Sequence, residues 1–216
     1  MSAIQKKSLF SAGRATYCAN LAEFDYTAWA TAQQQASRTD LDVFTGFPED
    51  INEILTEISE ADLQSLSSGV ACSFKLSNVG TEDINRSFKL HYSPVAAVSF
   101  LGDETLSSPG MSTNERVRRC MIARYLDIAA VLASDLKPEV LSVKVGLDPS
   151  TCSLLANTTV SQIRRVSLEL TELGACFTPR FNINLLSDLT CGVPADKLSA
   201  RKLNYLLVQS ALPKRL

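Results

Sequence analysis

Histidine is almost absent from this sequence, with His91 the only one among 216 residues. The chain also lacks a phosphate-binding P-loop, a GxGxxG turn, a GxSxG nucleophile elbow and an HExxH zinc motif. Catalysis requires a positioned acid, base or nucleophile, and His91, in KLHYSP, has no Ser or Cys motif around it. We therefore expect no enzyme activity and no catalytic residues, and we assign His91 a surface or packing role.

Closely spaced cysteines are also lacking. The six cysteines include no CxxC or CxxH pair, whereas structural zinc uses close ligand pairs. There is no run of eighteen apolar residues, as a membrane span requires. The opening MSAIQKKSLF lacks the continuous apolar region of a signal peptide. We expect no metal, no cofactor, no membrane association, reduced thiols and a cytoplasmic protein.

The composition is that of a globular protein, with 45% hydrophobic and 20% charged residues. Charge is unevenly distributed. Residues 1–110 hold 7 Lys and Arg against 14 Asp and Glu, whereas residues 111–216 hold 14 against 9. A basic half beside an acidic one suggests that the basic half lies nearer any polyanion, although surface charge can also vary this much without a functional reason.

A segment near the middle of the chain divides it into two parts. Residues 102–114, GDETLSSPGMSTN, are dense in Gly, Ser, Thr, Pro and Asp, which indicates a loop or linker. Residues 93–101, SPVAAVSFL, are typical of a short strand or a packed extended segment. We therefore divide the chain into an N-terminal half (1–92), a connecting segment (93–114) and a C-terminal half (115–216).

Each half contains one long helix with a single apolar stripe. The first is expected from about Gly13 to Ala36, and the second begins with Asn114 as a candidate N-cap and ends between Asp135 and Pro138. The apolar stripes are Tyr17, Leu21, Phe24 and Ala28 in the first helix, and Val117, Met121, Tyr125, Ile128 and Leu132 in the second.

A series of landmarks then repeats about one hundred residues apart. GFPED at 46–50 corresponds to GLDPS at 146–150, and each is followed by two short helices. The second helix of each pair opens with a capping pattern, at Ser59 and at Thr159. Both copies close with Ala-Cys and aromatic residues, as ACSFKL and ACFTPRF. We interpret the series as an internal duplication, although two short helix pairs can also resemble each other by chance. The matched buried positions are Leu55 with Leu155, Leu63 with Ile163 and Leu66 with Val166.

Residues 145–170 have the pattern of a helix-turn-helix. In such motifs the start of the second helix enters the major groove, where Arg can reach guanine or phosphate. A further basic set lies at the start of the second long helix, where its spacing suits phosphate contacts. The opposite interpretation, that these arginines only keep the surface soluble, stays open. The candidate nucleic-acid-binding residues are Gln162, Arg164, Arg165, Arg116, Arg118, Arg119 and Arg124.

The last segment, ADKLSARKLNYLLVQSALPKRL, is predicted to be an amphipathic helix ending at Pro213. It either packs on its own half or docks a partner. Its apolar side is expected to carry Leu198, Leu203, Leu206, Leu207 and Leu212, opposite Lys197, Arg201 and Lys202.

The second half resembles the FlhD subunit of the flagellar master transcription regulator. The resemblance covers residues 115–183 and lies in the order of Cys120–Leu136, GLDPSTCSLLANTT, VSQIRRVSLEL and GACFTPRF. Residues 14–76 resemble the same pattern more weakly, and residues 184–216 have no counterpart in it. The resemblance implies a mainly α-helical protein of two tandem FlhD-like halves, which form a pseudo-dimer with short β segments.

The resemblance also implies a function. FlhD-like subunits assemble with a zinc-containing, FlhC-like partner into a higher-order hetero-oligomer that binds promoter DNA, and such regulators also occur on conjugative elements. The family's closing-strand cysteine can form a disulfide, which implies that Cys72 and Cys176 approach each other. We expect a non-catalytic transcription-activator subunit. The alternative is a helical adaptor or chaperone that binds a protein partner without DNA.

Overall fold

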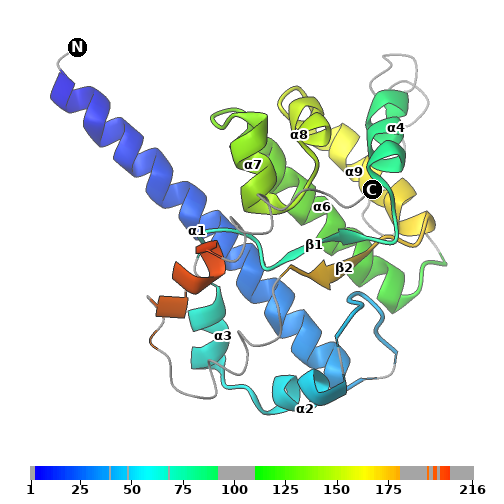
Figure 1. The fold of residues 1–216 in the computed structure, drawn as a ribbon. Helices are drawn as coiled ribbons and strands as arrows, with labels where there is room; N and C mark the ends of the chain where they lie inside the picture. The colour runs from blue at the N-terminus through cyan, green and yellow to red at the C-terminus, as the bar shows by residue number, and fades with distance from the viewer. Residues whose placement is uncertain are drawn as a thin grey trace.

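The computed structural model describes residues 3–38, 40–47, 49–67, 69–91, 110–180, 194, 197–198 and 200–204, with side chains from Cys18 onward except at positions 49 and 50. These residues form a mainly helical protein with a two-stranded antiparallel sheet (Figure 1). The expected fold class, helices with short β segments, is confirmed. The possible strand at 93–101 lies outside the described residues.

The described elements include those expected from the two halves, in the expected order, and two further helices, at 81–91 and 138–145, that the sequence patterns did not indicate. The first half contains α1 (Ala3–Ala36), α2 (Glu49–Glu57), α3 (Glu60–Leu66), β1 (Phe74–Ser77) and α4 (Thr81–His91). The second contains α6 (Thr113–Ala133), α7 (Pro138–Val145), α8 (Pro149–Leu155), α9 (Val160–Glu172) and β2 (Cys176–Pro179).

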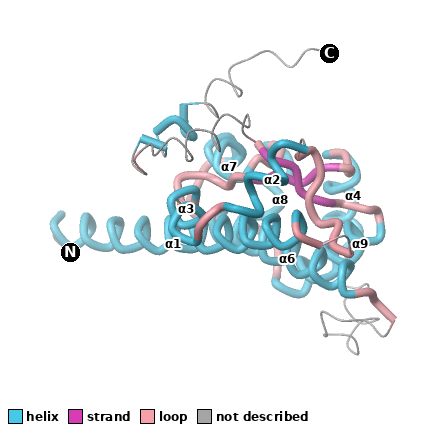
Figure 2. Tube along the Cα trace, turned by 90° about the horizontal axis from the view of Figure 1, so that it is seen from below, coloured by secondary structure: helices cyan, strands magenta, loops and turns pink. Residues whose placement is uncertain are grey.

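Helix α1 starts ten residues earlier than the apolar pattern predicted, at Ala3. Its N-terminal part projects beyond the other elements in both views (Figures 1 and 2). Further along the helix, Leu21, Phe24 and Ala28 are buried as predicted. The side chain of Tyr17 lies outside the described residues. The predicted stripe therefore marks the part of α1 that packs against the body of the protein.

Helix α6 begins before the expected cap. Its N-cap is Ser112, because the Ser112 hydroxyl accepts a bond from the Glu115 amide while the Glu115 carboxylate accepts one from the Ser112 amide. The assignment of Asn114 as the cap was wrong. Asn114 Oδ1 instead accepts a bond from the amide of Asp42 at 2.9 Å. Of the predicted stripe, Met121, Tyr125 and Leu132 are buried, and Val117 and Ile128 are partly buried.

The caps and buried positions predicted for the short helices are observed in both halves. Ser59 caps α3 by accepting a bond from the Asp62 amide, and Thr159 caps α9 by accepting one from the Gln162 amide. Gly46 and Gly146 both have a positive φ, of 80° and 85°. The predicted buried positions are at most 3% exposed: Leu55, Leu63, Leu66, Leu155, Ile163 and Val166.

The sheet joins the two halves. Strand β1 pairs with β2 from Phe74 opposite Pro179 to Ser77 opposite Cys176. On the first-half side, the amide of Phe177 donates to Val43 O at 2.9 Å, just before α2. On the second-half side, the amide of Cys72 donates to Lys144 O at 2.8 Å, near the C-terminal end of α7. Each strand region is therefore bonded by the other half, through the loop before α2 in one case and through α7 in the other.

Helix α4 and the C-terminal helical residues also cross between the halves. Helix α4, which follows β1, packs on α8 and α9. Lys202, which follows β2, bonds to Asp25 of α1 and to Leu66 O at the end of α3. The buried apolar side chains of both halves form one core. At its centre is a chain of aromatic contacts that joins Phe24, Phe44, Phe74, Tyr125 and Phe177.

The helical pattern of the sequence predicted Leu203 on the apolar side of the C-terminal helix and Lys202 on its polar side, and both predictions are wrong. Lys202 is 1% exposed and Leu203 is 38% exposed, whereas Leu198 is buried as expected. The reason is that Lys202 has a buried carboxylate partner, Asp25, which a helical pattern cannot reveal. The expected apolar positions 206, 207 and 212 lie outside the described residues.

Candidate functional site

The predicted recognition helix, α9, starts with a reciprocal cap. The side-chain oxygen of Gln162 accepts a bond from the Thr159 amide at 2.7 Å, and its amide nitrogen donates to His91 O at 3.3 Å. The imidazole Nε2 of His91 lies 2.9 Å from a carboxylate oxygen of Glu169, also on α9. Gln162 and His91 therefore tie α4 to α9, which gives His91 the packing role expected for it.

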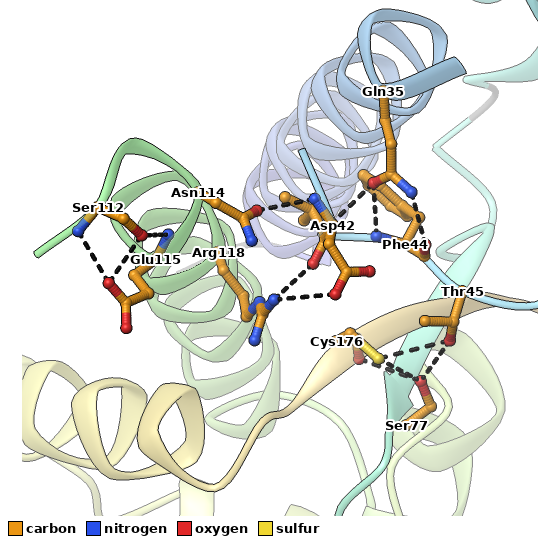
Figure 3. A network of polar contacts seen from close by, with 11 residues as sticks. Gln35, Asp42, Phe44, Thr45, Ser77, Ser112, Asn114, Glu115, Arg118 and Cys176 are labelled. Carbon is orange, nitrogen blue, oxygen red and sulfur yellow. Dashed lines mark hydrogen bonds and ion pairs between the residues drawn. The ribbon is translucent and has the colours of Figure 1, made fainter. Parts of the chain in front are cut away.

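The arginines expected to contact DNA differ in their surroundings. Arg116 is exposed and forms no bond with another described side chain. Arg118 donates to Asp42 O at 2.7 Å, beside the Asn114 contact (Figure 3). Arg119 is only 4% exposed, and its Nε and Nη1 atoms have no hydrogen-bond partner among the described residues. Arg124 forms an ion pair with Glu23 of α1. The start of α6 is thus partly engaged within the protein.

On α9, Arg164 and Arg165 are both half-buried. Arg164 forms no ion pair or hydrogen bond with another described side chain. Arg164 and Arg124 both line an open groove of about 450 Å³ between α1, α6 and α9. The structure therefore brings together two of the predicted residues, Arg124 and Arg164. The residues that line the groove are Asn20, Glu23, Cys120, Ala123, Arg124, Asp127, Ile128, Val131, Val160, Ile163 and Arg164.

The cysteine pairing implied by the family resemblance is absent. Cys72 and Cys176 are both buried free thiols. The sheet register places Cys176 opposite Ser77, while Cys72 precedes β1 near the other end of the sheet. Burial raises the pKa of the Cys72 thiol to about 12, and the negative charge of Asp25 adds to the shift. Cys72 is therefore a protonated core residue at neutral pH.

Sequence reasoning missed a buried polar cluster around Asp25. Asp25 is fully buried and accepts bonds from the Ser73 amide at 2.5 Å and the Ser73 hydroxyl at 2.7 Å. Lys202 supplies the opposing charge and also bonds Ser73 Oγ and Leu66 O, at 2.8 and 3.2 Å. Trp29 Nε1 donates to Ser73 Oγ at 3.0 Å. The only local signal was an aspartate next to Phe24 on the apolar face of α1.

The cluster has the composition of a structural charge pair, since each charged group is buried and its hydrogen bonds are satisfied. No group of three or more His, Cys, Asp or Glu in the part of the chain that the structure describes is arranged to hold a metal ion. Within the same ranges, no helix combines the length and apolarity needed to cross a bilayer.

Comparisons of the chain with protein-family models, with curated proteins and with solved structures find no match. The functional argument therefore depends on the residues themselves: a groove with two arginines, an exposed Arg116, and two halves joined through one sheet and one core.

Proposed function

We propose that this chain is a non-catalytic subunit of a transcription-activator complex, similar in role to FlhD. In this proposal it is a fused pseudo-dimer in the cytoplasm. It assembles with a zinc-containing, FlhC-like partner and reaches promoter DNA through the resulting hetero-oligomer.

The reciprocal contacts between the halves are the observation that carries this proposal. Val43, in the loop before α2, bonds Phe177 of β2, and Lys144, near the end of α7, bonds Cys72, which precedes β1 by two positions. Helix α4 packs on the second half, while the helical residues after β2 reach back to the first. A two-fold symmetric dimer exchanges equivalent segments in the same way, because each contact occurs twice.

The sheet register supports the pseudo-dimer more specifically. Two-fold axes between antiparallel strands pass through residue pairs, and an axis through Lys75 and Thr178 would superimpose Phe74 on Phe177. Both of these phenylalanines are fully buried. In this superposition Cys72 corresponds to Ala175, so the Ala-Cys match in the sequence is displaced by one residue. In the long helices, an offset of 101 positions pairs buried residues with one another: Leu21 with Ile122, Phe24 with Tyr125 and Ala28 with Ala129.

For the DNA contact, the start of α6 is the best supported region. Arg116 is exposed with no described partner, whereas the Nε and Nη1 atoms of Arg119 are buried and out of reach of a phosphate. An exposed guanidinium that lacks an acceptor gains from an incoming phosphate oxygen. Arg124 is less suited, since Glu23 already neutralises it.

A protein-binding adaptor that makes no DNA contact is the second candidate. The observation in its favour is the pairing of Arg118 with Asp42 and of Arg124 with Glu23, because both pairs reduce the positive charge available to a phosphate backbone. Both candidates require a protein partner and differ only in the DNA contact.

Salt-dependent DNA binding separates the two candidates. The complex purified from cells that express the chain is titrated with labelled promoter DNA, and fluorescence anisotropy is measured at several salt concentrations. Arg116→Ala is expected to weaken binding and to reduce the slope of log affinity against log salt by about 1, as the loss of one phosphate contact does. Lys89→Ala, which removes an exposed charge from α4, is the matched control.

The α9 arginines are tested in the same assay. If Arg164→Ala with Arg165→Ala lowers affinity more than Arg116→Ala does, the DNA contact is at α9 and not at α6. A complex that binds no DNA at low salt would favour the adaptor.

A further inference from the structure

The groove between α1, α6 and α9 has an apolar floor. Two valines in it are strongly exposed, Val131 of α6 at 45% and Val160 of α9 at 56%. Apolar surface of this kind gains free energy when it is covered. The other apolar lining residues are Ala123, Ile128 and Ile163.

The charges in the groove favour a protein over a nucleic acid as its occupant. Two carboxylates, Glu23 and Asp127, line the groove and oppose a phosphate backbone. The Glu23 carboxylate is paired with Arg124, whereas Asp127 and Arg164 have no described partner. A complementary occupant therefore carries an acid facing Arg164 and a base facing Asp127, beside an apolar stripe.

The first half shows how the corresponding space is closed within one chain. At the position that matches Asp127, α1 carries Tyr26, whose ring packs against the core. The Tyr26 hydroxyl donates to a carboxylate oxygen of Glu60 at 3.2 Å, and Glu60 matches Val160. Gly69 also lies against α1 at Cys18 and Ala22. The α6 residue that matches Ala22, Ala123, lines the open groove.

We propose that this groove is the docking site for an amphipathic helix of a protein partner. The partner inserts an aromatic side chain where the first half places Tyr26, and it presents an acid to Arg164. This inference rests on the partner binding that both candidate functions share and on the correspondence between the halves, but it does not depend on DNA binding.

A variant that copies the first half tests the proposal. Asp127→Tyr combined with Val160→Glu installs the tyrosine and glutamate that close the corresponding space. The probe is a phage-displayed library of helical peptides, selected on the full-length wild-type chain, and the selected peptides are then synthesised and labelled. Affinities are measured by fluorescence anisotropy, and circular dichroism and thermal melts establish that each variant folds.

The expected result is a set of peptides with an aromatic residue and an acid on one helical face. Their binding weakens at least about tenfold with the closing variant and with Val131→Glu, which places a charge on the apolar floor. Val140→Glu, at an equally exposed valine on α7, leaves affinity within about twofold. Arg164→Glu weakens binding, and a Lys in place of the peptide acid restores it.

Three results would overturn the proposal. The first is peptide binding that is equal in all variants, or a library that yields no peptide dependent on Val131. The second is displacement of the peptide by a promoter duplex, which would make DNA the occupant. The third is self-association of the wild-type chain that Val131→Glu abolishes, which would make a second copy the occupant. Because the assay contains no DNA in its first arm, failure of the activator proposal leaves this inference standing.

Discussion

At the scale of single residues, Asp25 is the fully buried carboxylate of the described part of the protein, and its charge needs compensation inside the core. Its carboxylate is fully buried, and it is compensated by Lys202 and by two bonds from Ser73. A buried pair of this kind adds little net stability compared with apolar residues of the same shape. Removal of only one partner is far more costly, because the other charge then stays buried without compensation.

Lys202→Met should therefore destabilise the protein by about 3–5 kcal/mol. The methionine keeps the apolar stem but leaves Asp25 unpaired and Leu66 O without its donor. Urea unfolding followed by circular dichroism measures the change. Lys197→Met is the control on the same helical segment, where the lysine is exposed, and its effect should stay within about 0.5 kcal/mol. Equal stability of the two variants would mean that the buried pair does not anchor this segment.

At the scale of elements, the two short-helix pairs diverge after their shared caps. Helix α3 ends at Leu66, whereas α9 continues to Glu172. The chain after α3 turns at Gly69, with a φ of 67°, and passes so close to α1 that an added Cβ would lie 2.2 Å from Cys18 O. Glycine is required there for both its conformation and its size. In the first half this turn covers the surface of α1 at Cys18 and Ala22. In the second half the groove beside α6 and α9 stays open.

Gly69→Ala should cost about 2–5 kcal/mol, because it combines left-handed strain with overlap against the backbone of α1. Gly174→Ala is the matched control. Its φ is 78°, but nothing lies within 4 Å of an added Cβ, so only the conformational cost of about 1–2 kcal/mol is expected. Chemical denaturation of both variants gives their free energies of unfolding. Similar losses of stability would show that the backbone of α1 moves at Cys18 to make room for the added Cβ.

Local features were predictable at this scale because neighbouring residues determine them. The caps at Ser59 and Thr159 follow from side chains three positions apart, and the buried stripe of α6 follows from helical periodicity. Asn114 was misassigned because Ser112 and Glu115 form a better cap two residues earlier. Asn114 instead contacts Asp42, which is 72 positions away in the sequence. Periodicity carries no information about such a contact.

At the scale of the whole molecule, the two halves do not form separate cores. Phe177 of the second half packs against Phe24 and Phe44 of the first, with ring centroids 6.2 and 5.8 Å apart. The groove likewise needs residues from three helices in both halves. The sequence indicated a division near residue 102 and the pairing of landmarks, but not that the halves exchange α4 and the C-terminal segment.

A chain cut in the connecting segment should therefore behave as two interdependent pieces. Residues 1–100 and 101–216 expressed separately should aggregate or lack cooperative unfolding, because each piece exposes the core surface that the other covers. Co-expressed, they should copurify as a one-to-one complex with the helical content of the intact chain. Affinity capture through a tag on one piece, followed by a thermal melt, provides the measurement. Cooperative unfolding of either piece alone would show that its core is self-sufficient.

The link between Asp25 and Lys202 has a consequence for the synthesis of the chain. The two residues are separated by 177 positions. At typical translation rates of about 5–20 residues per second, the ribosome needs roughly 9–35 s after Asp25 to reach Lys202. During that interval the carboxylate has no counter-charge, so it stays hydrated and the first half cannot close around it. The order of synthesis therefore means that the hydrophobic core is completed only after the C-terminal helical residues have been translated.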